Sequence, residues 1–472
     1  MALIATDKPR LIVGLGATGL SCARFLRAWG VPFAIADSRE NPPGLDAIRS
    51  EMADVEIHLG AFDAELFKAA GELIVSPGVA LTEPAVAAAL DAGVSVCGDI
   101  DVFVGALRVR AEMRGQTPAP IVAITGSNGK STVTTLVGAM AKAAGKKVGV
   151  GGNLGTPALD LLRDDAIGGP ADLYVLELSS FQLERARPLN PRVATVLNVS
   201  ADHQDRHPTL VSYHGAKHRV FRGAEQVVIN RADPLTIPLV ADSVTRWTFG
   251  LDAPDFKGFG VRENDAGSGR KEKYLAFERE LLMPVRELNI AGNHNIANAL
   301  AALALGHAVG LPMAAMLQAL REFPGLPHRC QLVAAHAGVR YFNDSKGTNV
   351  GATVAAIEGL CATPADKVVL IAGGVGKGQA FHALAPVLQR CGRAVVLIGE
   401  AADEIAQVLG ATVAQVRADS MEAAVRAAAQ LAQTGDSVLL SPACASFDMF
   451  NNYAHRGEVF VDAVKKLAEV RA

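Results

Sequence analysis

The stretch IVAITGSNGKSTVTT, residues 121–135, decides how the rest of the chain is interpreted. An apolar run that can end a buried strand leads into a turn bounded by Gly126 and Gly129, and a helix-compatible segment follows. The glycines let backbone N–H groups point inward without Cβ clashes, and the positive end of the helix attracts an anion. An ordinary Gly/Ser/Asn turn is the alternative, but the strand-like and helix-like flanks favour a variant phosphate-binding loop, with its glycines closer together than in the general pattern.

The side chains that follow the turn suit a nucleoside triphosphate. Lys130 can reach the terminal phosphates, and Ser131 or Thr132 can offer a hydroxyl to Mg²⁺. The sequence therefore predicts a triphosphate site made by the whole loop: Gly126, Ser127, Asn128, Gly129, Lys130, Ser131 and Thr132.

Length and composition indicate a globular protein of several domains. The chain has 472 residues, of which 50% are hydrophobic, and at ~150 residues per domain this suggests about three domains. No apolar run reaches the ~20 residues of a membrane span, and the N-terminus lacks a signal-type pattern, so we expect a cytoplasmic protein without membrane insertion. The six cysteines are scattered and read as reduced core thiols. A net charge of −3 gives no basic field for nucleic acid, which is excluded as a partner.

Apolar β-rich runs alternate with alanine-rich helical runs along the whole chain, as in LIVGLG, SCARFLRAWG and VPFAIAD. This alternation predicts an α/β fold of mainly parallel sheets covered by helices, in three blocks. Breaks fall near LRVRAEMRGQTPAP and FPGLPHR, where charge, Pro and Gly interrupt the pattern. The polar segment FKGFGVRENDAGSGRKEKY is expected to be a loop or an exposed hairpin inside the middle block.

A second glycine motif lies near the N-terminus. Gly14, Gly16 and Gly19 form G-x-G-x-x-G between a strand-like and a helical run, and Asp37 ends the next strand-like run. Such a turn accepts a pyrophosphate, Asp37 can accept from a ribose hydroxyl, and Arg39 can stack on a base or pair with a phosphate. The same geometry serves a nicotinamide dinucleotide or any other nucleotide diphosphate, and a purely structural glycine turn is the third interpretation.

Acidic and histidine side chains follow two further strand-like runs. Glu177 ends ADLYVLE, and Asp202 and His203 follow VATVLNVS. Each alone reads equally well as a solvated strand end or a packing residue, but two adjacent strands ending in this way would face one Mg-triphosphate.

Lys217 lies in the helix-compatible segment TLVSYHGAKHRVF, on one face with Tyr213 and Phe221. A lysine framed by aromatic rings is partly desolvated, which favours its neutral amine. A snorkelling surface lysine is the alternative.

The last block concentrates cations and hydroxyls at the ends of apolar runs, which suits an anionic substrate and a transferring phosphoryl group. These residues are Arg329, Asp344, Lys346, Thr348, Lys377 and Ser446. Each could also be a surface charge or a turn residue.

With these segments in view, the chain resembles the Mur ligases of bacterial cell-wall synthesis, and among them the members that add D-glutamate. The motifs that carry the resemblance follow one another along the whole chain: GLGATGLS, ITGSNGKSTVTTL, GGNLG, LELSSFQLE, NVSADHQDR, YHGAK, GNHNIANALAA, GLPHR, NDSKGTN, GGVGKG and SPACASFD. The resemblance implies ATP-dependent addition of D-glutamate to UDP-N-acetylmuramoyl-L-alanine through an acyl phosphate, by a monomer.

Three domains are implied. Residues 1–110 would form a Rossmann-like domain for the UDP-linked substrate, residues 111–326 a P-loop ATPase-type domain, and residues 327–472 a Rossmann-like domain for the amino acid. Domain closure is expected to bring the substrates together.

The resemblance also implies roles for single residues. ATP would contact Gly126 to Thr132, Asn295, Asn298, Arg329 and Asp344. The UDP-linked substrate would contact Ala17, Thr18, Asp37, Ser38, Arg39, Ser76, Gly78, Asn153 and Ser179. D-Glutamate would contact Thr348, Lys377, Ser446 and Tyr453. Two Mg²⁺ ions would be held by Ser131, Glu177, His203 and a carbamylated Lys217. The catalytic residues would be Lys130, His203, Lys217, Lys346 and Lys377. Tyr453 and Ala17 depart from residues that relatives often carry, so those contacts are expected to differ in detail.

Other functions explain less of the sequence. A nicotinamide oxidoreductase accounts for the Gly14 turn but leaves the phosphate loop and NDSKGTN unexplained. A P-loop switch or motor accounts for residues 126–132 but not for the two end blocks. Closer alternatives are the ligases that add L-alanine or a diamino acid, and the related folylpolyglutamate synthases.

Overall fold

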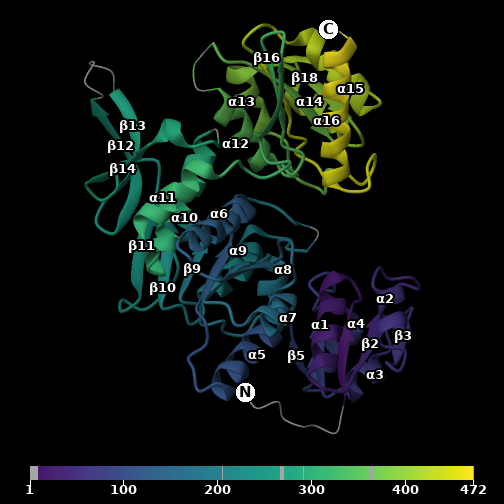
Figure 1. The fold of residues 1–472 in the computed structure, drawn as a ribbon. Helices are drawn as coiled ribbons and strands as arrows, with labels where there is room; N and C mark the ends of the chain where they lie inside the picture. Colours follow the sequence, from purple (N-terminus) through teal and green to yellow (C-terminus); the bar gives the residue numbers. More distant parts are fainter. Residues whose placement is uncertain are drawn as a thin grey trace.

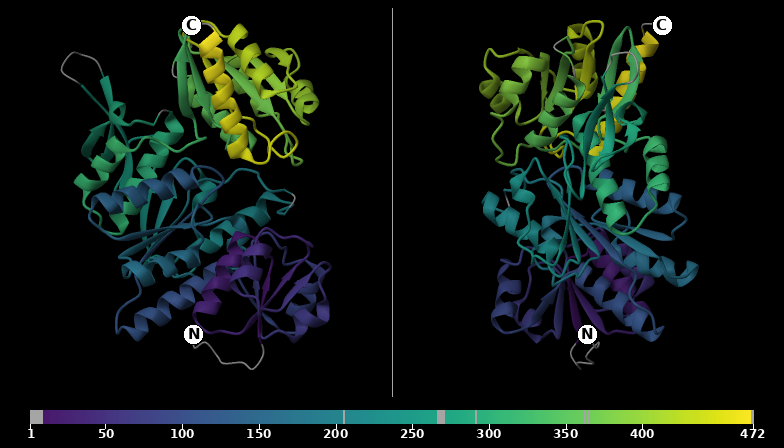
Figure 2. Two further views of the ribbon diagram at one scale, coloured as in Figure 1. Left: turned by 45° about the vertical axis from the view of Figure 1, so that its right-hand side comes forward. Right: turned by 90° about the vertical axis from the view of Figure 1, so that its left-hand side faces the viewer.

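The computed structural model describes residues 9–204, 206–265, 271–290, 292–361, 363 and 365–470. Three sheets, each with its own helices, form three units that follow one another along the molecule, with the central unit between the two terminal ones (Figure 1). The two turned views in Figure 2 show the same order. The three α/β blocks expected from the sequence are therefore confirmed.

The N-terminal unit is a five-stranded parallel sheet in the order β3-β2-β1-β4-β5. Its strands are β1 (Arg10–Val13), β2 (Phe33–Asp37), β3 (Ile57–Leu59), β4 (Glu72–Val75) and β5 (Ser95–Cys97), and its helices are α1 (Ala17–Ala28), α2 (Leu45–Glu51), α3 (Ala64–Ala69) and α4 (Pro84–Asp91). Apolar clusters lie on both faces of this sheet, which is why its strands read as continuous apolar runs. At the end of β1, a Cβ at Gly19 would stand 2.0 Å from the carbonyl oxygen of Gly14, so the turn closes only with glycine.

The central unit is a nine-stranded sheet in the order β14-β13-β12-β11-β10-β9-β6-β8-β7. Its strands are β6 (Ile121–Thr125), β7 (Val148–Gly152), β8 (Leu173–Glu177), β9 (Val193–Val196), β10 (Gln226–Asn230), β11 (Thr245–Phe249), β12 (Gly258–Asp265), β13 (Lys271–Phe277) and β14 (Glu280–Pro284). Its helices are α5 (Asp99–Met113), α6 (Lys130–Ala143), α7 (Ala158–Gly168), α8 (Ser180–Leu183), α9 (Leu210–His218), α10 (Asn293–Ala308) and α11 (Met313–Glu322), with short 3₁₀ turns η1 (Arg219–Phe221), η2 (Pro234–Thr236) and η3 (Val285–Glu287).

The strand order of the central sheet positions the phosphate loop. β6 pairs in parallel with β8 on one side and with β9 on the other, so the loop after β6 emerges between the carboxyl ends of two other strands. Ligands of open α/β sheets bind in such a crevice. The polar segment of the middle block forms an antiparallel pair, β12 with β13, on the described residues either side of 266–270.

The C-terminal unit is a six-stranded sheet in the order β15-β16-β20-β17-β18-β19, parallel except for β15. Its strands are β15 (Gln331–His336), β16 (Val339–Asn343), β17 (Val368–Gly373), β18 (Gly392–Ile398), β19 (Ala414–Arg417) and β20 (Ser437–Leu440), and its helices are α12 (Val350–Leu360), α13 (Leu384–Cys391), α14 (Ala402–Leu409), α15 (Met421–Leu431) and α16 (Tyr453–Val470). The neighbouring carboxyl ends of β16, β20 and β17 lead into the segments that carry Lys346, Ser446 and Lys377.

The N-terminal and central units share one apolar core around α5. Phe103 of α5 meets Tyr174 of β8 edge to face, with ring centroids 5.2 Å apart, and one buried cluster contains residues of both sheets. The C-terminal unit has two clusters of its own. The helix α5 runs across position 110, and the domain boundaries at 110 and 326 stay predictions.

Within the part of the chain that the structure describes, no helix is long and apolar enough to cross a bilayer.

Candidate active site

The loop after β6 has the conformation that a phosphate cradle needs. Gly126 and Gly129 have φ angles of 153° and 83°, which side chains other than glycine rarely adopt. A Cβ at Gly129 would also stand 2.4 Å from Asn298 Oδ1. The helix α6 starts directly at Lys130, so its N-terminal N–H groups face the loop.

Lys130 folds back over this loop. Its ammonium nitrogen donates to the carbonyl oxygens of Gly126, at 2.8 Å, and Ser127, at 2.9 Å. Burial lowers the pKa of Lys130 from its ordinary value, while the nearby carboxylate of Glu177 opposes that shift.

Ser131 is the point where two of the units meet. Its hydroxyl oxygen accepts from Arg329 Nη2 at 2.7 Å and lies 3.4 Å from the ammonium nitrogen of Lys346. Both cations come from the last block of the chain, 198 and 215 residues further on. The first helical turn after the phosphate loop is therefore surrounded by positive charge from two units.

Glu177 ends β8 directly beside this point. Asn153 donates from Nδ2 to Glu177 Oε1 at 2.8 Å, whereas Glu177 Oε2 is buried and receives no hydrogen bond from any described residue. Burial alone would raise the pKa of Glu177, but the charge of Lys130 and the hydrogen bond from Asn153 leave it below its ordinary value. An ionised carboxylate with one unpaired buried oxygen is a ligand suited to Mg²⁺.

His203 lies in the loop after β9, in the left-handed conformation with φ 52°. Its ring meets Phe181 edge to face at 4.8 Å, and its Nε2 lies 3.8 Å from Asp202 Oδ2. Among the described residues, no group of three or more His, Cys, Asp or Glu side chains converges. A magnesium ion here would thus have few protein ligands and would complete its coordination with phosphate oxygens and water, as Mg²⁺ commonly does.

Lys217 is buried in the last turn of α9. Its nitrogen lies 4.3 Å from the centroid of the Tyr213 ring and donates to the carbonyl oxygen of Gly126 at 2.8 Å. Burial, with a contribution from Lys130, holds the pKa of Lys217 well below its ordinary value. The structure thus brings Lys217 to the phosphate loop; Phe221, expected on the same helical face, lies in η1 instead.

A cavity of about 460 Å³ opens beside the loop, between the central and C-terminal units. Among the residues predicted to contact ATP, its lining includes Asn128, Gly129, Thr132, Asn295, Asn298, Arg329 and Asp344. Burial raises the pKa of Asp344 to about 6, although its carboxylate accepts from Ser441 Oγ at 2.7 Å and from the N–H of Cys330 at 3.1 Å.

The residues predicted to hold the amino acid lie on neighbouring segments but are less closely gathered. Lys346 lies 5.0 Å from the Tyr453 ring centroid, and burial lowers its pKa to about 8. A bridge between Val375 and Ala445 holds the segment before Lys377 beside the segment that carries the buried Ser446. Lys377 is exposed and Thr348 half-buried, and among the described residues neither side chain forms a hydrogen bond or ion pair with Ser131.

A second cavity, of about 490 Å³, lies at the carboxyl ends of the N-terminal strands. Its lining includes these residues predicted for the UDP-linked substrate: Ala17, Thr18, Asp37, Ser38, Arg39, Ser76, Gly78 and Asn153. Ser179 does not line it; its hydroxyl caps α8 by accepting from the N–H of Gln182. Asp37 accepts from Arg39 Nε and Nη2 at 2.8 and 2.7 Å, so the two predicted contact residues are paired with each other.

Sequence reasoning missed Asn349, which links the units. Asn349 Nδ2 donates to Asp202 Oδ2 at 3.1 Å and to Asn128 Oδ1 at 3.2 Å. It is the last residue of the NDSKGTN motif, which was the one available signal. Gln182, which lines the second cavity, was also missed, although it lies in the LELSSFQLE motif.

Three family profiles match the chain in the order of its three sheets. They are described as the Mur ligase MurD-like N-terminal domain, over residues 8–98, the Mur ligase middle domain, over residues 124–306, and the Mur ligase glutamate ligase domain, over residues 328–444.

Similar proteins cover the whole chain. A UDP-N-acetylmuramoylalanine--D-glutamate ligase of Pseudomonas savastanoi pv. phaseolicola is 58% identical over 469 residues, which are 99% of this chain and 100% of that protein. The ligase of the same name from Pseudomonas aeruginosa is 57% identical over 468 residues, with the same coverage.

Solved structures agree in fold. The UDP-N-acetylmuramate-alanine ligase MurC of Thermotoga maritima has a TM-score of 0.58 at 18% identity and covers 98% of this chain and 100% of its own. The MurF ligase of Thermotoga maritima, solved in complex with ADP, has a TM-score of 0.56 at 17% identity and covers 98% of this chain and 96% of its own. Three matching profiles and relatives at 57–58% identity over the full length lead to one conclusion: the chain belongs to the Mur ligase family.

Proposed function

We propose that this protein is an ATP-dependent ligase that joins D-glutamate to UDP-N-acetylmuramoyl-L-alanine. The observation that carries the proposal is the identity of 57–58%, over 99% of the chain, with relatives named for that reaction. The geometry supports it, because cations from a separate unit meet the phosphate loop at Ser131 and one cavity opens beside that loop. The second cavity is lined by Asn153, which bonds to Glu177 beside the loop.

The reaction has two steps. A carboxylate oxygen of the L-alanine end attacks the γ-phosphorus of ATP, the bond to the bridging oxygen breaks, and ADP leaves an acyl phosphate behind. The amine of D-glutamate, having lost a proton, then attacks the acyl carbon, and inorganic phosphate departs as the amide forms. The first step is needed because a free carboxylate is a poor electrophile.

The chain supplies positive charge where the phosphoryl group would transfer. Lys130, Arg329 and Lys346 all lie within hydrogen-bonding reach of the loop or of Ser131. Such groups offset charge that develops on phosphoryl oxygens, which is usually the largest catalytic effect in such sites. Asn295 and Asn298 would lie by the base, Asp344 by the ribose, and Thr348, Lys377, Ser446 and Tyr453 by D-glutamate.

Magnesium fits the residues present. The unpaired Oε2 of Glu177, the hydroxyl of Ser131 and the ring of His203 would hold the ions, and Mg²⁺ would supply charge neutralisation on the phosphates. ADP in the related MurF ligase of Thermotoga maritima supports adenine nucleotide as the substrate.

Lys217 would act as a carbamate. Its burial favours the neutral amine that reacts with CO₂, and its position on the loop would turn a cation into an anionic ligand beside the metal. We therefore expect Lys217→Ala to lose nearly all activity and to regain part of it when a short carboxylic acid is added. Phosphate release with and without acetate measures this, and full activity of Lys217→Ala without any addition would exclude the role.

One assay tests the proposed function. The protein is incubated with ATP, Mg²⁺ and UDP-N-acetylmuramoyl-L-alanine, with D-glutamate, L-glutamate, a diamino acid or no amino acid in separate reactions, and phosphate release is measured. We expect release only with D-glutamate. Release without any amino acid would indicate an ATPase switch, and release with a diamino acid would indicate another member of the family. A cytoplasmic monomer is also expected.

A further inference from the structure

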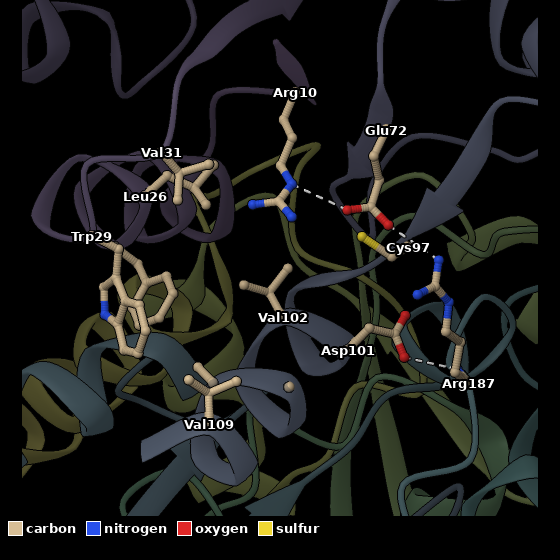
Figure 3. A pocket seen from close by; sticks show the side chains of 13 residues that line it. Arg10, Leu26, Trp29, Val31, Glu72, Cys97, Asp101, Val102, Val109 and Arg187 are labelled. Atoms are coloured by element: carbon tan, nitrogen blue, oxygen red, sulfur yellow. Dashed lines mark hydrogen bonds and ion pairs between the residues drawn. The ribbon is translucent and has the colours of Figure 1, made fainter. Parts of the chain in front are cut away.

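One short segment of the central unit grips the N-terminal unit. It runs from 182, within α8, to 187, and two of its side chains, those of Arg185 and Arg187, bond to the N-terminal unit. Gln182 Nε2 donates to Asp99 Oδ2, at the start of α5, at 3.0 Å. Arg187 donates from Nη2 to Glu72 Oε1 at 3.1 Å and from its backbone N–H to Asp101 Oδ1 at 2.7 Å, as Figure 3 shows beside a pocket at the amino ends of the strands.

Arg185 is the most deeply buried of these residues, with a side chain only 1% exposed. Its Nη1 donates to the carbonyl oxygens of Val75 and Ser76, both at 2.8 Å, and its Nη2 to that of Val79 at 2.9 Å. Nη2 also reaches Glu184 Oε1 at 3.1 Å. Both terminal nitrogens are thus engaged by protein oxygens, two of which belong to the 76–79 loop of the N-terminal unit and one to the last residue of β4.

The aliphatic part of the Arg185 side chain is also packed closely. A Cβ at Gly98 would stand 3.1 Å from Arg185 Cδ, so the side chain lies directly against the backbone there. Arg206 shares its partners, because its Nη2 also donates to Val79 O, at 2.9 Å, and to Glu184. Two guanidinium groups of the central unit therefore fix one end of the 76–79 loop.

This loop forms a wall of the second cavity. Residues 76–79 line that cavity together with the Gly14 turn and Asp37. On the side away from Arg185, Ser76 Oγ donates to the carbonyl oxygen of Gly14 at 2.8 Å. The loop is thereby held between the glycine turn and Arg185. Arg185 follows Glu177, the last residue of β8, by eight positions, so it also ties the loop to the end of that strand.

We propose that Arg185 is a positioning residue for the UDP-linked substrate: it holds the 76–79 loop in the shape that receives the substrate and fixes this wall relative to the phosphate loop. The inference rests on the proposed function. Arg185 acts through the backbone of the loop, because both of its terminal nitrogens are already bonded to protein oxygens.

The test compares Arg185→Met and Arg185→Lys with Arg187→Met. Arg187 belongs to the same segment and also bonds to the N-terminal unit. It does so at the amino ends of β4 and β5, whereas the second cavity lies at the carboxyl ends of the strands. For Arg185→Met we expect the KM for UDP-N-acetylmuramoyl-L-alanine to rise by about tenfold or more, since bonds to a charged group are lost. The KM values for ATP and D-glutamate and the kcat should change by less than about threefold, because they depend on residues outside the 76–79 loop.

Arg185→Lys keeps the charge but cannot span three carbonyl oxygens, so its KM for the UDP-linked substrate should lie between those of wild type and Arg185→Met. If Arg185→Met does not fold, the KM of Arg185→Lys for the UDP-linked substrate alone tests the inference. Arg187→Met should keep all three KM values near wild type. Calorimetric titration of each variant with the UDP-linked substrate, without ATP, should give the same ranking of Kd.

Unchanged KM for the UDP-linked substrate in both Arg185 variants would overturn the inference. An equal rise in all three KM values, or the same effect from Arg187→Met, would also overturn it, because either points to general loosening of the units. Wild type is assayed first. Absence of phosphate release with D-glutamate would refute the proposed function and this inference together, whereas an active wild type with unaffected Arg185 variants refutes this inference alone.

Discussion

Replacing Lys130 should lower turnover while the protein still folds. Among the described residues it bonds only to carbonyl oxygens of its own loop, and burial already disfavours its charge. We expect Lys130→Ala to lower kcat by on the order of 10²–10³, because a cation next to the transferring phosphoryl group is removed. Lys142→Ala, at the exposed end of the same helix, is the matched control and should keep its turnover. Near-normal ligation by Lys130→Ala would refute the phosphate-loop assignment.

Asp344 should make stability depend on pH. Burial raises its pKa from 3.8 to about 6 in the folded protein, so the folded state holds this proton more tightly than the unfolded state. The stabilising contribution of the Asp344 carboxyl is therefore complete below pH 3.8 and is lost as the pH rises to about 6. The effect is on the order of 3 kcal/mol.

Asp344→Asn cannot titrate and isolates this contribution. Its melting temperature relative to wild type should improve as the pH rises through that window. Melting curves of both proteins at several pH values measure this, and a constant difference between them would contradict the raised pKa.

At the scale of elements, much of the architecture could be predicted because parallel strands buried on both faces read as short apolar runs. The three α/β blocks followed from that pattern, and the pairing of β6 with β8 and β9 explains why Glu177 lies beside the phosphate loop. The extent of the antiparallel pair β12–β13 could not be predicted, since its exposed half is polar and resembles a loop. Likewise, α9 ends at His218, before Phe221, although the periodicity continues.

The turn between β1 and α1 gives a prediction at this scale. Helix and strand approach so closely that a Cβ at Gly19 would overlap the backbone carbonyl of Gly14, which cannot move without breaking the sheet. We expect Gly19→Ala to cost at least about 1 kcal/mol of stability. Gly16→Ala is the control, because among the described residues no atom beyond its chain neighbours lies within 4 Å of its Cβ position and its φ is −89°. Thermal melting of both variants measures the difference, and equal melting temperatures would contradict the close approach.

At the scale of the whole molecule, the contacts between units escaped sequence reasoning. Asn128 and Asn349 are 221 positions apart, and Arg185 binds backbone carbonyls 106 to 110 positions away. Such contacts leave no periodicity and need no particular partner side chain. Motifs such as those after β6 and β8 end a strand locally, so the sequence can point to them, whereas the roles of their residues stay predictions. How three strand ends from two sheets face one another depends on the docking of whole units.

Asn349 offers a test of that docking. Its Nδ2 reaches Asp202 and Asn128 in the central unit, while its Oδ1 caps α12 by accepting from the N–H of Ala352 at 2.8 Å. Serine can keep the cap but is too short for the link, so Asn349→Ser should melt close to wild type. Its kcat should still fall several-fold, because Lys346 and Thr348 precede this link and would be held less firmly at the phosphate loop.

Asn349→Asp sharpens the comparison. Aspartate keeps the cap but places a carboxylate against Asp202, so repulsion should separate the units further and lower kcat below that of Asn349→Ser. High salt should restore part of the loss in Asn349→Asp and none in Asn349→Ser, because only the former involves repelling charges. Steady-state rates at low and high salt measure this, and small-angle scattering reports the separation of the units. If both variants keep wild-type kcat, the link between Asn349 and the phosphate loop has no part in bringing the cations of the last unit to Ser131.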